Sequence, residues 1–267
     1  MIGQPFYVLD RIDSTNNYAM EQVNTGQITP GTAWFAMEQT AGKGQRGKQW
    51  LSPPGENIML TLALQPNGLP LSRQFMLSVA VALGAADFFA KYAGDETCIK
   101  WSNDIYWRDR KAGGILIENV LRGNTWQYAI TGMGININQT RFPEHLPNPV
   151  SLRQITGKSW DAVELAKELC ACLEPWLKQL HPAHYNELLA TYKSRLFRLN
   201  EPGLYRIREE YFNAKIPRYG TQVLDPVKDE YFQGIIRDVL PDGKLCLEKD
   251  GALLQFDFGE VEFVIAK

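Results

Sequence analysis

The residues with the clearest chemical potential lie in a glycine-rich segment, EQTAGKGQRGKQW, at positions 38–50. Glycines and cations alternate along it: Gly42, Lys43, Gly44, Arg46, Gly47 and Lys48. Glycines let a backbone approach a ligand closely and expose its N–H groups, and the cations would offset a bound anion. The segment therefore predicts a loop that folds over an anionic ligand. A flexible surface hairpin loop with solvated charges is the alternative.

Two nucleotide-binding patterns fit this segment by letter, and both fail on context. GKGQRG fits G-x-G-x-x-G, and GKGQRGK fits most of G-x-x-x-x-G-K-[ST]. Each pattern needs a helix to begin at the loop, so that the helix N-terminus meets the phosphates. Here the chain continues into WLSPPG, which cannot start such a helix, and Gln49 stands where the second pattern needs Ser or Thr.

A lysine on a predicted strand is the second candidate. In TCIKW, at positions 97–101, alternation places Lys100 on one face with Ser102, and Ile99 and Trp101 on the other. A lysine so close to apolar strand residues is costly to bury unless it meets an anion. Two readings stay open: an anion-binding lysine, or one that reaches solvent from the strand end.

Three further short motifs could take part in chemistry. Asn103 and Asp104 indicate a turn, in which the aspartate either caps the backbone or contacts magnesium. KAGG at 111–114 brings a cation and small residues to the start of a strand. GMGININ at 132–138 puts two glycines on a strand, which indicates a bulge or the close approach of another group. Asn136 suits either a purine edge or a turn.

The elements that must position these residues alternate between strands and helices and then change to strands alone. Strands are predicted at 6–12, 32–37, 57–65, 97–101, 115–121 and 126–138, and helices at 14–23, from Ser72 to Gly94, at 161–180 and at about 183–196. Asp161 and Glu164 resemble a capping box, and Pro175 is expected to kink or end the third helix. From about 218 the hydrophobic period is two, and five short strands, the first at 221–227, suggest a small barrel.

Composition and charge exclude several classes of protein. The chain has 267 residues, 45% of them hydrophobic and 22% charged, which is ordinary globular composition. A formal charge of −2 argues against a general binder of nucleic acid or anionic membranes. Four cysteines without a CxxC motif, and three histidines, argue against a structural zinc site. We find no signal peptide and no run of 18 apolar residues, so we expect a cytoplasmic protein that spans no membrane.

Five motifs, in this order, resemble those of the biotin protein ligases, also called biotin–[acetyl-CoA-carboxylase] ligases: DSTNNYA (13–19), EQTAGKGQRGKQW (38–50), KWSNDIYW (100–107), KAGGILIE (111–118) and GMGININ (132–138). The usual family patterns are close to GRGRRGRxW and KWPND. This sequence has Lys43, Gln45 and Lys48 in place of arginines, and Ser102 in place of proline. Lys43 keeps the charge without the bidentate fork of arginine, whereas Gln45 loses a cation.

The resemblance implies two half-reactions. The carboxylate of biotin attacks the α-phosphate of ATP to give biotinyl-5′-adenylate and pyrophosphate. A lysine of a biotin carboxyl carrier domain then attacks the mixed anhydride and releases AMP. ATP and biotin are the substrates, and Mg²⁺ accompanies the phosphates. Because carboxylate and polyphosphate repel each other, cations must bring them together.

The resemblance also implies three sets of site residues. The catalytic set is Lys100, Lys43 and Arg46, with Lys100 between the biotin carboxylate and the α-phosphate. The biotin-binding set is Ser14, Thr15, Asn16, Gln39, Gly42, Lys43, Gly44, Gln45, Lys100 and Trp101. The adenylate-binding set is Gly44, Arg46, Trp50, Asn103, Lys111, Gly113, Gly114, Gly132, Gly134 and Asn136. Metal ligands stay unassigned beyond the ATP phosphates, with Asp104 as a side-chain candidate.

The fold that the resemblance implies is α+β. A mixed β-sheet with helices packed on it, of the class II synthetase-like type, would cover 1–217, and an SH3-like barrel would cover 218–267. Because the first predicted strand begins near residue 6, we expect neither the N-terminal helix-turn-helix of some family members nor a nucleic-acid partner. The expected protein partner is the carrier domain of a carboxylase. A homodimer through sheet edges, common in the family, stays open.

Three alternatives to this function remain. A lipoate ligase or octanoyl transferase belongs to the same superfamily, but its RRxxGGGxVxHD-type motif is not found in the sequence. A biotin-binding protein with poor turnover is suggested by Gln45 and Ser102. A non-catalytic binding module would use the C-terminal barrel, but it would not need the glycine-rich loop together with Lys100.

Overall fold

The computed structural model describes the chain except for residues 27, 67, 124, 208–229 and 266–267. The chain divides into two compact units, Met1–Phe197 and Arg198–Lys267. The first unit contains the glycine-rich loop, the lysines and every other residue that the sequence analysis assigned to a site.

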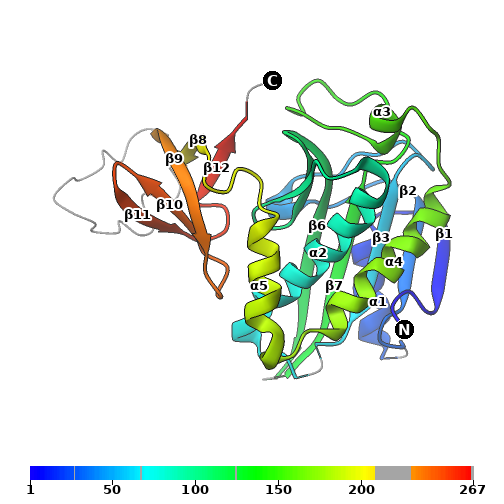
Figure 1. Cartoon of the computed structure of the whole chain (residues 1–267). Helices are drawn as coiled ribbons and strands as arrows, with labels where there is room; N and C mark the ends of the chain where they lie inside the picture. Colours follow the sequence, from blue (N-terminus) through cyan, green and yellow to red (C-terminus); the bar gives the residue numbers. More distant parts are fainter. Residues whose placement is uncertain (27, 67, 124, 208–229, 266–267) are drawn as a thin grey trace. The chain divides into compact units, whose positions relative to one another are not determined.

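The first unit is built on a seven-stranded sheet with the strand order β1-β2-β3-β7-β6-β5-β4 (Figure 1). Its strands are β1 (Phe6–Ile12), β2 (Ala33–Gln39), β3 (Ile58–Leu64), β4 (Thr97–Lys100), β5 (Asp104–Trp107), β6 (Arg110–Arg122) and β7 (Thr125–Ile135). β1 and β2 run parallel and their other neighbours are antiparallel. The sheet is therefore mixed, which confirms the predicted α+β class.

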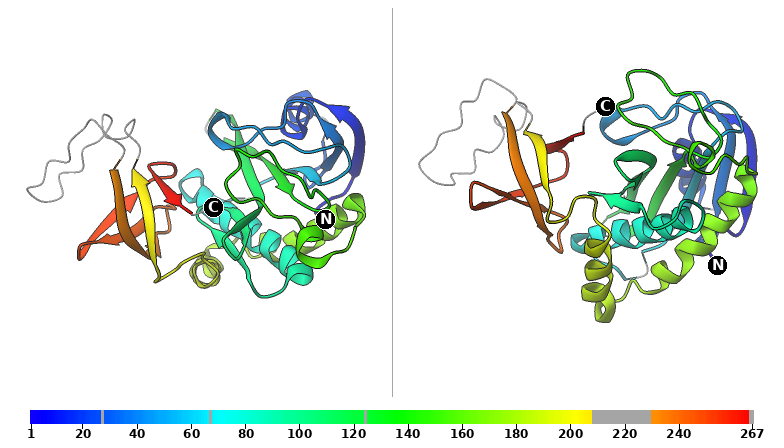
Figure 2. Two further views of the ribbon diagram at one scale, coloured as in Figure 1. Left: turned by 90° about the horizontal axis from the view of Figure 1, so that it is seen from above. Right: turned by 45° about the horizontal axis from the view of Figure 1, so that its top comes forward.

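Helices cover both faces of this sheet. They are α1 (Thr15–Thr25), α2 (Gln74–Ala93), α3 (Leu152–Thr156), α4 (Ala162–Lys178) and α5 (Tyr185–Ser194), with 3-10 turns η1 (Gln45–Gly47), η2 (Leu71–Arg73) and η3 (Pro182–His184). Figure 2, together with Figure 1, shows α1 on one face of the sheet and α2 and α4 on the other. The mixed sheet is thus the middle layer of three.

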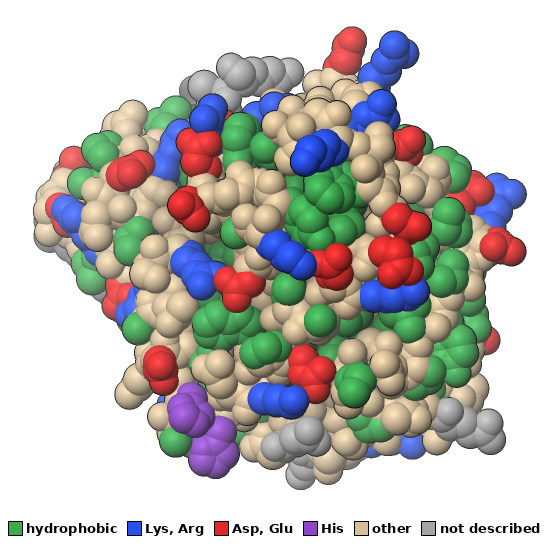
Figure 3. Space-filling model, turned by 45° about the vertical axis from the view of Figure 1, so that its right-hand side comes forward, with side chains coloured by type: hydrophobic (Ala, Val, Ile, Leu, Met, Phe, Trp, Pro, Cys, Tyr) green, Lys and Arg blue, Asp and Glu red, His purple; other side chains and the backbone are tan. Residues whose placement is uncertain are grey.

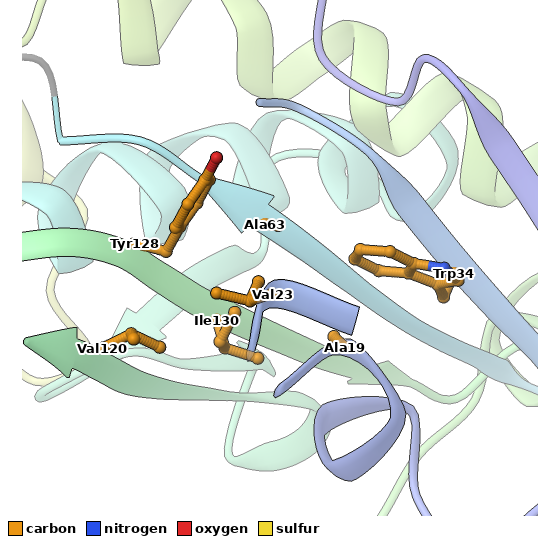
Figure 4. Packing of buried hydrophobic residues seen from close by; sticks show 7 residues of the cluster. All are labelled: Ala19, Val23, Trp34, Ala63, Val120, Tyr128 and Ile130. Carbon is orange, nitrogen blue, oxygen red and sulfur yellow. The ribbon is translucent and has the colours of Figure 1, made fainter. Parts of the chain in front are cut away.

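The central strand β3 is buried along its whole length, because both of its faces are covered. Ala63 packs with Ala19 and Val23 of α1, beside Trp34 and Ile130 (Figure 4). By the two-residue alternation of a strand, the leucines on either side of Ala63 face α2 and α4 instead. The alternation predicted at 57–65 is present, although the residues on both faces of the strand are apolar around Ala63.

Helix α2 is the main core helix of the second face. With the preceding turn, Leu71–Ala93 is long and apolar enough to cross a membrane by length and composition, but 67% of its most apolar stretch is buried inside the unit. Burial of this kind is typical of a core helix that is apolar all round. The helix ends before Gly94, as predicted, whereas η2 occupies the position where Ser72 was expected to be the cap.

Helix α4 tests two expectations at its ends. The carboxylate of Asp161 accepts hydrogen bonds from the backbone N–H groups of Val163 and Glu164, so Asp161 is the N-cap. The carboxylate of Glu164 accepts from Lys167, so only the Asp161 half of the predicted capping box is confirmed. The helix does not end at Pro175 but continues to Lys178. Because Pro175 lies in the last turn, its missing N–H removes one hydrogen bond near the end and leaves the rest of the helix intact.

The second unit is a five-stranded antiparallel sheet with the order β11-β10-β9-β8-β12. Its strands are β8 (Pro202–Ile207), β9 (Glu230–Val239), β10 (Leu245–Lys249), β11 (Ala252–Phe256) and β12 (Val261–Val264). The division at Phe197/Arg198 lies earlier than the predicted one at 217/218, because β8 pairs with β9 and β12. The strand predicted at 221–227 lies outside the described residues.

Replacing Gly84 of α2 tests how closely the two core helices pack. Alanine normally stabilises a helix interior by about 0.5–1 kcal/mol relative to glycine. A Cβ at Gly84 would lie 2.8 Å from Cα of Leu173 in α4. We therefore expect Gly84→Ala to lower the free energy of unfolding by about 1–3 kcal/mol, measured by urea denaturation. A gain in stability would show that α2 and α4 separate easily.

Candidate functional site

Two glycines of β7 form the floor of the candidate site. A Cβ at Gly132 would overlap the side-chain amide of Asn16, and one at Gly134 would overlap the indole ring of Trp50. The close approach predicted from these glycines is therefore present. Asn16 comes from α1 and Trp50 from the end of the glycine-rich segment, so the floor lies on the α1 face of the sheet.

The start of α1 contributes a cluster of buried polar side chains. Ser14, Thr15 and Asn16 are at most 4% exposed. Oε1 of Gln39 accepts from the backbone N–H of Thr15 at 2.7 Å and from its hydroxyl at 3.0 Å. The hydroxyl of Thr61 lies 2.8 Å from Oγ1 of Thr15 and 2.7 Å from Oδ1 of Asn16. Four of the predicted biotin-binding residues are thus brought together, with Thr61 as a fifth polar neighbour that the sequence analysis did not select.

The glycine-rich segment forms a tight hairpin-like loop. The backbone N–H of Gly44 donates to the carbonyl of Lys48 at 2.6 Å, and that of Trp50 donates to the carbonyl of Gly42 at 2.9 Å. Arg46 has a φ of 56° at the tip of the loop. The next element is β3 rather than an α-helix. This order confirms that neither nucleotide-binding pattern applies.

Side chains of the loop contact the sheet at two points. Nε2 of Gln45 donates to Oδ1 of Asn103 and to the carbonyl of Ile115, both at 2.8 Å. Nζ of Lys43 lies 3.7 Å from Oε1 of Glu118. These contacts hold the loop against β6 and against the turn that follows β4. Lys43 and Gln45 therefore lie beside the other residues that were assigned to the site.

Lys100 is the last residue of β4 and pairs with Asp104, the first residue of β5. Burial lowers the pKa of Lys100 to about 8, the negative charge of Asp104 opposes this shift, and the positive charges of Lys111 and Lys48 reinforce it. Its Nζ also lies 5.5 Å from the centre of the Tyr106 ring. The lysine predicted to meet an anion is therefore poorly solvated and lies among other charges.

Lys111 belongs to the same charged group. Its Nζ lies 2.7 Å from Oδ2 of Asp104. A Cβ at Gly114 would come within 3.3 Å of both Oδ1 of Asp104 and Nζ of Lys111, so the glycine leaves room for this pair. Asp104 thus pairs with Lys111 and also attracts Lys100. The two lysines and the single carboxylate together carry a net positive charge.

A buried hydrogen-bond network supports the turn between β4 and β5. Nδ2 of Asn103 donates to Oγ of Ser78 in α2 at 3.2 Å, and Oγ of Ser102 lies 3.2 Å from Oδ1 of Asn103. The hydroxyl of the fully buried Tyr192 in α5 donates to the backbone carbonyl of Ser102 at 2.6 Å. Helices α2 and α5 therefore both fix the turn that carries Lys100.

The side-chain amide of Asn136, which the sequence analysis assigned to the adenylate-binding set, is directed at backbone carbonyls of the protein. Its Nδ2 donates to the carbonyl of Val150 at 3.0 Å and lies 3.4 Å from that of Lys111. Its backbone N–H donates to the carbonyl of Ala112 at 2.8 Å. The side-chain amide thus ties the chain at 150 to the start of β6, while a role in reading a base stays a prediction.

Glu118, like Thr61, is a residue of this site that sequence reasoning missed. Besides the contact with Lys43, its Oε2 accepts from Nδ2 of Asn16 at 2.7 Å. Strand alternation along β6 could have found it, because Gly114, Leu116 and Glu118 share one face. It was not selected from the sequence, because a carboxylate is not expected in a site that should bind anions.

The chain is similar to proteins of known families. The model of the biotin/lipoate A/B protein ligase family matches residues 8–136. The bifunctional ligase/repressor BirA of Escherichia coli (strain K12) is 32% identical over 267 residues, which cover 97% of this chain and 74% of that relative. The biotin–[acetyl-CoA-carboxylase] ligase of Paracoccus denitrificans is 32% identical over 206 residues, with 74% of this chain and 84% of the relative covered. Among solved structures, the biotin protein ligase from Aquifex aeolicus in complex with biotin and ATP has a TM-score of 0.73 at 23% identity, over 97% of each chain.

The lowered pKa of Lys100 predicts a pH dependence of stability. The pKa of Lys100 is about 8 in the folded protein against 10.5 for an ordinary exposed lysine, so the unfolded chain binds more protons between these two pH values. Stability must therefore rise with pH in this window, by about 1–3 kcal/mol from this group. We expect Lys100→Gln to remove that rise, measured as the difference between urea unfolding at pH 7.5 and at pH 10 without ligand. Equal pH dependence of wild type and variant would contradict the burial of this ammonium.

Proposed function

The chain belongs to the biotin/lipoate A/B protein ligase family, and from this premise we propose that it activates biotin with ATP and transfers the biotin to a lysine of a carrier domain. The observation that carries the proposal is the meeting of two lysines, Lys100 and Lys111, with a cationic glycine-rich loop beside a buried polar cluster. Such a site can hold an uncharged polar ring at one end and two anions at the other.

Activation requires the carboxylate of biotin to attack the α-phosphate of ATP while pyrophosphate leaves. Lys100 is already partly stripped of water, so its attraction to an arriving anion is stronger than that of an exposed lysine. Lys111 adds a second cation, which Asp104 holds at 2.7 Å. We assign these two lysines to neutralising the carboxylate and the α-phosphate, with Lys43 and Arg46 of the loop on the opposite side.

Recognition of biotin falls to the polar cluster at the start of α1. A ureido ring offers N–H donors and a carbonyl acceptor, and Ser14, Thr15, Asn16 and Gln39 present both kinds of partner within one small region. The two floor glycines let the side chains of Asn16 and Trp50 approach the sheet closely, and the ring of Trp50, which lies against Gly134, supplies an apolar wall. The remaining predicted binding residues, Gly42, Gly44, Gln45 and Trp101, would line the valeryl chain and carboxylate.

Transfer requires the intermediate to survive until an acceptor arrives. The amine of the acceptor lysine attacks the carbonyl carbon of the mixed anhydride, and AMP leaves. A loop held over the site excludes water and thereby slows hydrolysis of the anhydride. The contacts of Gln45 with Asn103 and Ile115 support this role, since they hold the loop without using the charges that the ligand needs.

Mg²⁺ would enter with the nucleotide rather than occupy a site of its own. Among the residues that the structure describes, no group of three or more His, Cys, Asp or Glu side chains could hold a metal ion. Asp104 is the nearest candidate ligand, and it is bonded to Lys111. Magnesium commonly relies on substrate phosphates and only one or two carboxylates, which fits this arrangement. It would supply charge neutralisation at the phosphates.

The acceptor is proposed to be the biotin carboxyl carrier domain of a carboxylase, in the cytoplasm, with no nucleic-acid or membrane partner. The formal charge of −2 supports this, as do the interspersed basic and acidic side chains on the face seen in Figure 3. The Escherichia coli relative is named a repressor as well as a ligase. For this chain we propose the ligase activity alone, and a homodimer through sheet edges stays a proposal.

Mass addition to a purified carrier domain tests the function directly. We expect wild type to add one biotin in the presence of biotin, ATP and Mg²⁺, and to add no lipoate under the same conditions. Lys100→Ala should lower the rate of biotinyl-adenylate formation by at least about 100-fold, because it removes a desolvated cation from the developing charge.

Lys91→Ala is the matched control, since Lys91 pairs with Glu168 on the surface between α2 and α4. It should keep the wild-type rate. Adenylate formation by Lys100→Ala at nearly that rate would exclude the proposed role of Lys100. Transfer of lipoate in preference to biotin would instead favour the lipoate ligases of the same family.

A further inference from the structure

A carboxylate lies inside a site that must bind anions. The side chain of Glu118 on β6 is 33% exposed, and Nζ of Lys43 lies 3.7 Å from its Oε1. Its Oε2 accepts from the buried amide of Asn16 at 2.7 Å. The carboxylate of biotin and the phosphates of ATP are all negative, so Glu118 opposes their binding by charge alone. Its position therefore needs another physical reason.

We propose that Glu118 is a displaceable counter-ion for Lys43. While the site is empty, Glu118 holds the ammonium over the site; when an anionic substrate or intermediate enters, Lys43 turns from Glu118 to that ligand. The proposal rests on the proposed function, and it makes Glu118 a positioning residue that acts through Lys43. It differs from the direct roles assigned to Lys100 and Lys111.

The strength of the pair suits an exchange of partners. Lys43 is 42% exposed, and its separation of 3.7 Å from a partly exposed carboxylate gives a weak ion pair. A ligand that presents a carboxylate and a phosphate can replace this pair with closer and more highly charged contacts. A permanent buried ion pair would be much harder to break.

The neighbouring contacts let the lysine move while its surroundings stay in place. Asn16 fixes one oxygen of Glu118, so that the other oxygen is left to face Lys43. Gln45 holds the adjacent loop backbone to Asn103 and Ile115 by neutral hydrogen bonds. The long flexible stem of a lysine can turn its ammonium between two anions, whereas an arginine fork needs a fixed geometry. Lysine in place of the family's usual arginine at position 43 therefore matches the proposal.

The variant Glu118→Gln separates the ionic contact from the structural one. Glutamine keeps an oxygen that can accept from Asn16, and it loses only the charge that attracts Lys43. We expect it to lower the Kd for biotin by about 2- to 5-fold, the range of a partly exposed ion pair. In a Lys43→Ala background the same substitution should change the Kd by less than half of that factor, measured by isothermal titration.

Two results of this titration would overturn the proposal. An equal factor in both backgrounds would show that Glu118 acts through its own charge rather than through Lys43. Weaker biotin binding by Glu118→Gln would show that the carboxylate mainly supports the local structure. Glu96→Gln is the matched control, because Glu96 pairs with exposed Arg108 at the far end of β4 from Lys100, and it should leave the Kd unchanged.

A second measurement without ligand keeps this test independent of the proposed function. The ion pair holds Nζ of Lys43 beside Glu118, so Glu118→Gln should release the amine and speed its acetylation by an N-hydroxysuccinimide ester. We expect a rate increase of about twofold or more, read by peptide mass spectrometry, with Lys167 as internal reference. An unchanged rate would exclude the pair. If wild type bound no biotin and formed no adenylate, the proposed function would fail, and the acetylation rates would still decide whether the pair exists.

Discussion

The site depends on holding two ammonium groups beside one carboxylate, with the Lys100 ammonium poorly solvated and the Lys111 side chain 35% exposed. Burial lowers the pKa of Lys100 to about 8, Lys111 reinforces the shift, and Asp104 opposes it. Such an arrangement is unfavourable in the empty protein, because the excess positive charge is poorly solvated. It persists because the fold around it is rigid: the turn between β4 and β5 is bonded to α5 through Tyr192 and to α2 through Asn103. An arriving anion relieves the repulsion, so the same charges that weaken the empty fold strengthen binding.

For the glycine-rich loop the cost is one of conformational entropy, because glycines lose much backbone freedom when they are ordered. Backbone hydrogen bonds inside the loop offset part of that cost, and two side chains add contacts with the sheet. Gln45 makes neutral bonds to fixed acceptors, whereas Lys43 makes an ionic contact with Glu118. The loop can therefore be ordered by one residue and remain electrostatically responsive through the other. This division of roles would be lost if both positions carried the same side chain.

Much of the fold could be predicted from the sequence because its long elements have strong periodicity, as in β3 and in the helix that ends before Gly94. The strand Asp104–Trp107 was missed, since four residues show little period and Asn103 with Asp104 favours a turn. The early boundary was missed because β8 becomes recognisable only when paired with β9 and β12. Motif spacing identified many of the residues that gather at the site. Strand alternation could have placed Glu118 on the same face of β6 as Gly114, but its contacts with Lys43 and Asn16 depend on tertiary structure.

Gln45 occupies a position where the family usually has arginine, and it changes how the loop is held against the sheet. An arginine at this position would add a fourth cation to the loop that already carries Lys43, Arg46 and Lys48, and it would repel Lys100. Glutamine instead satisfies a buried asparagine, since Asn103 is 5% exposed and its Oδ1 accepts from Nε2 of Gln45. The turn that carries Lys100 and the loop that covers it are then joined through one amide pair. The turn that carries Lys100 and the glycine-rich loop thereby become parts of a single hydrogen-bond network, in which charge is concentrated on fewer residues.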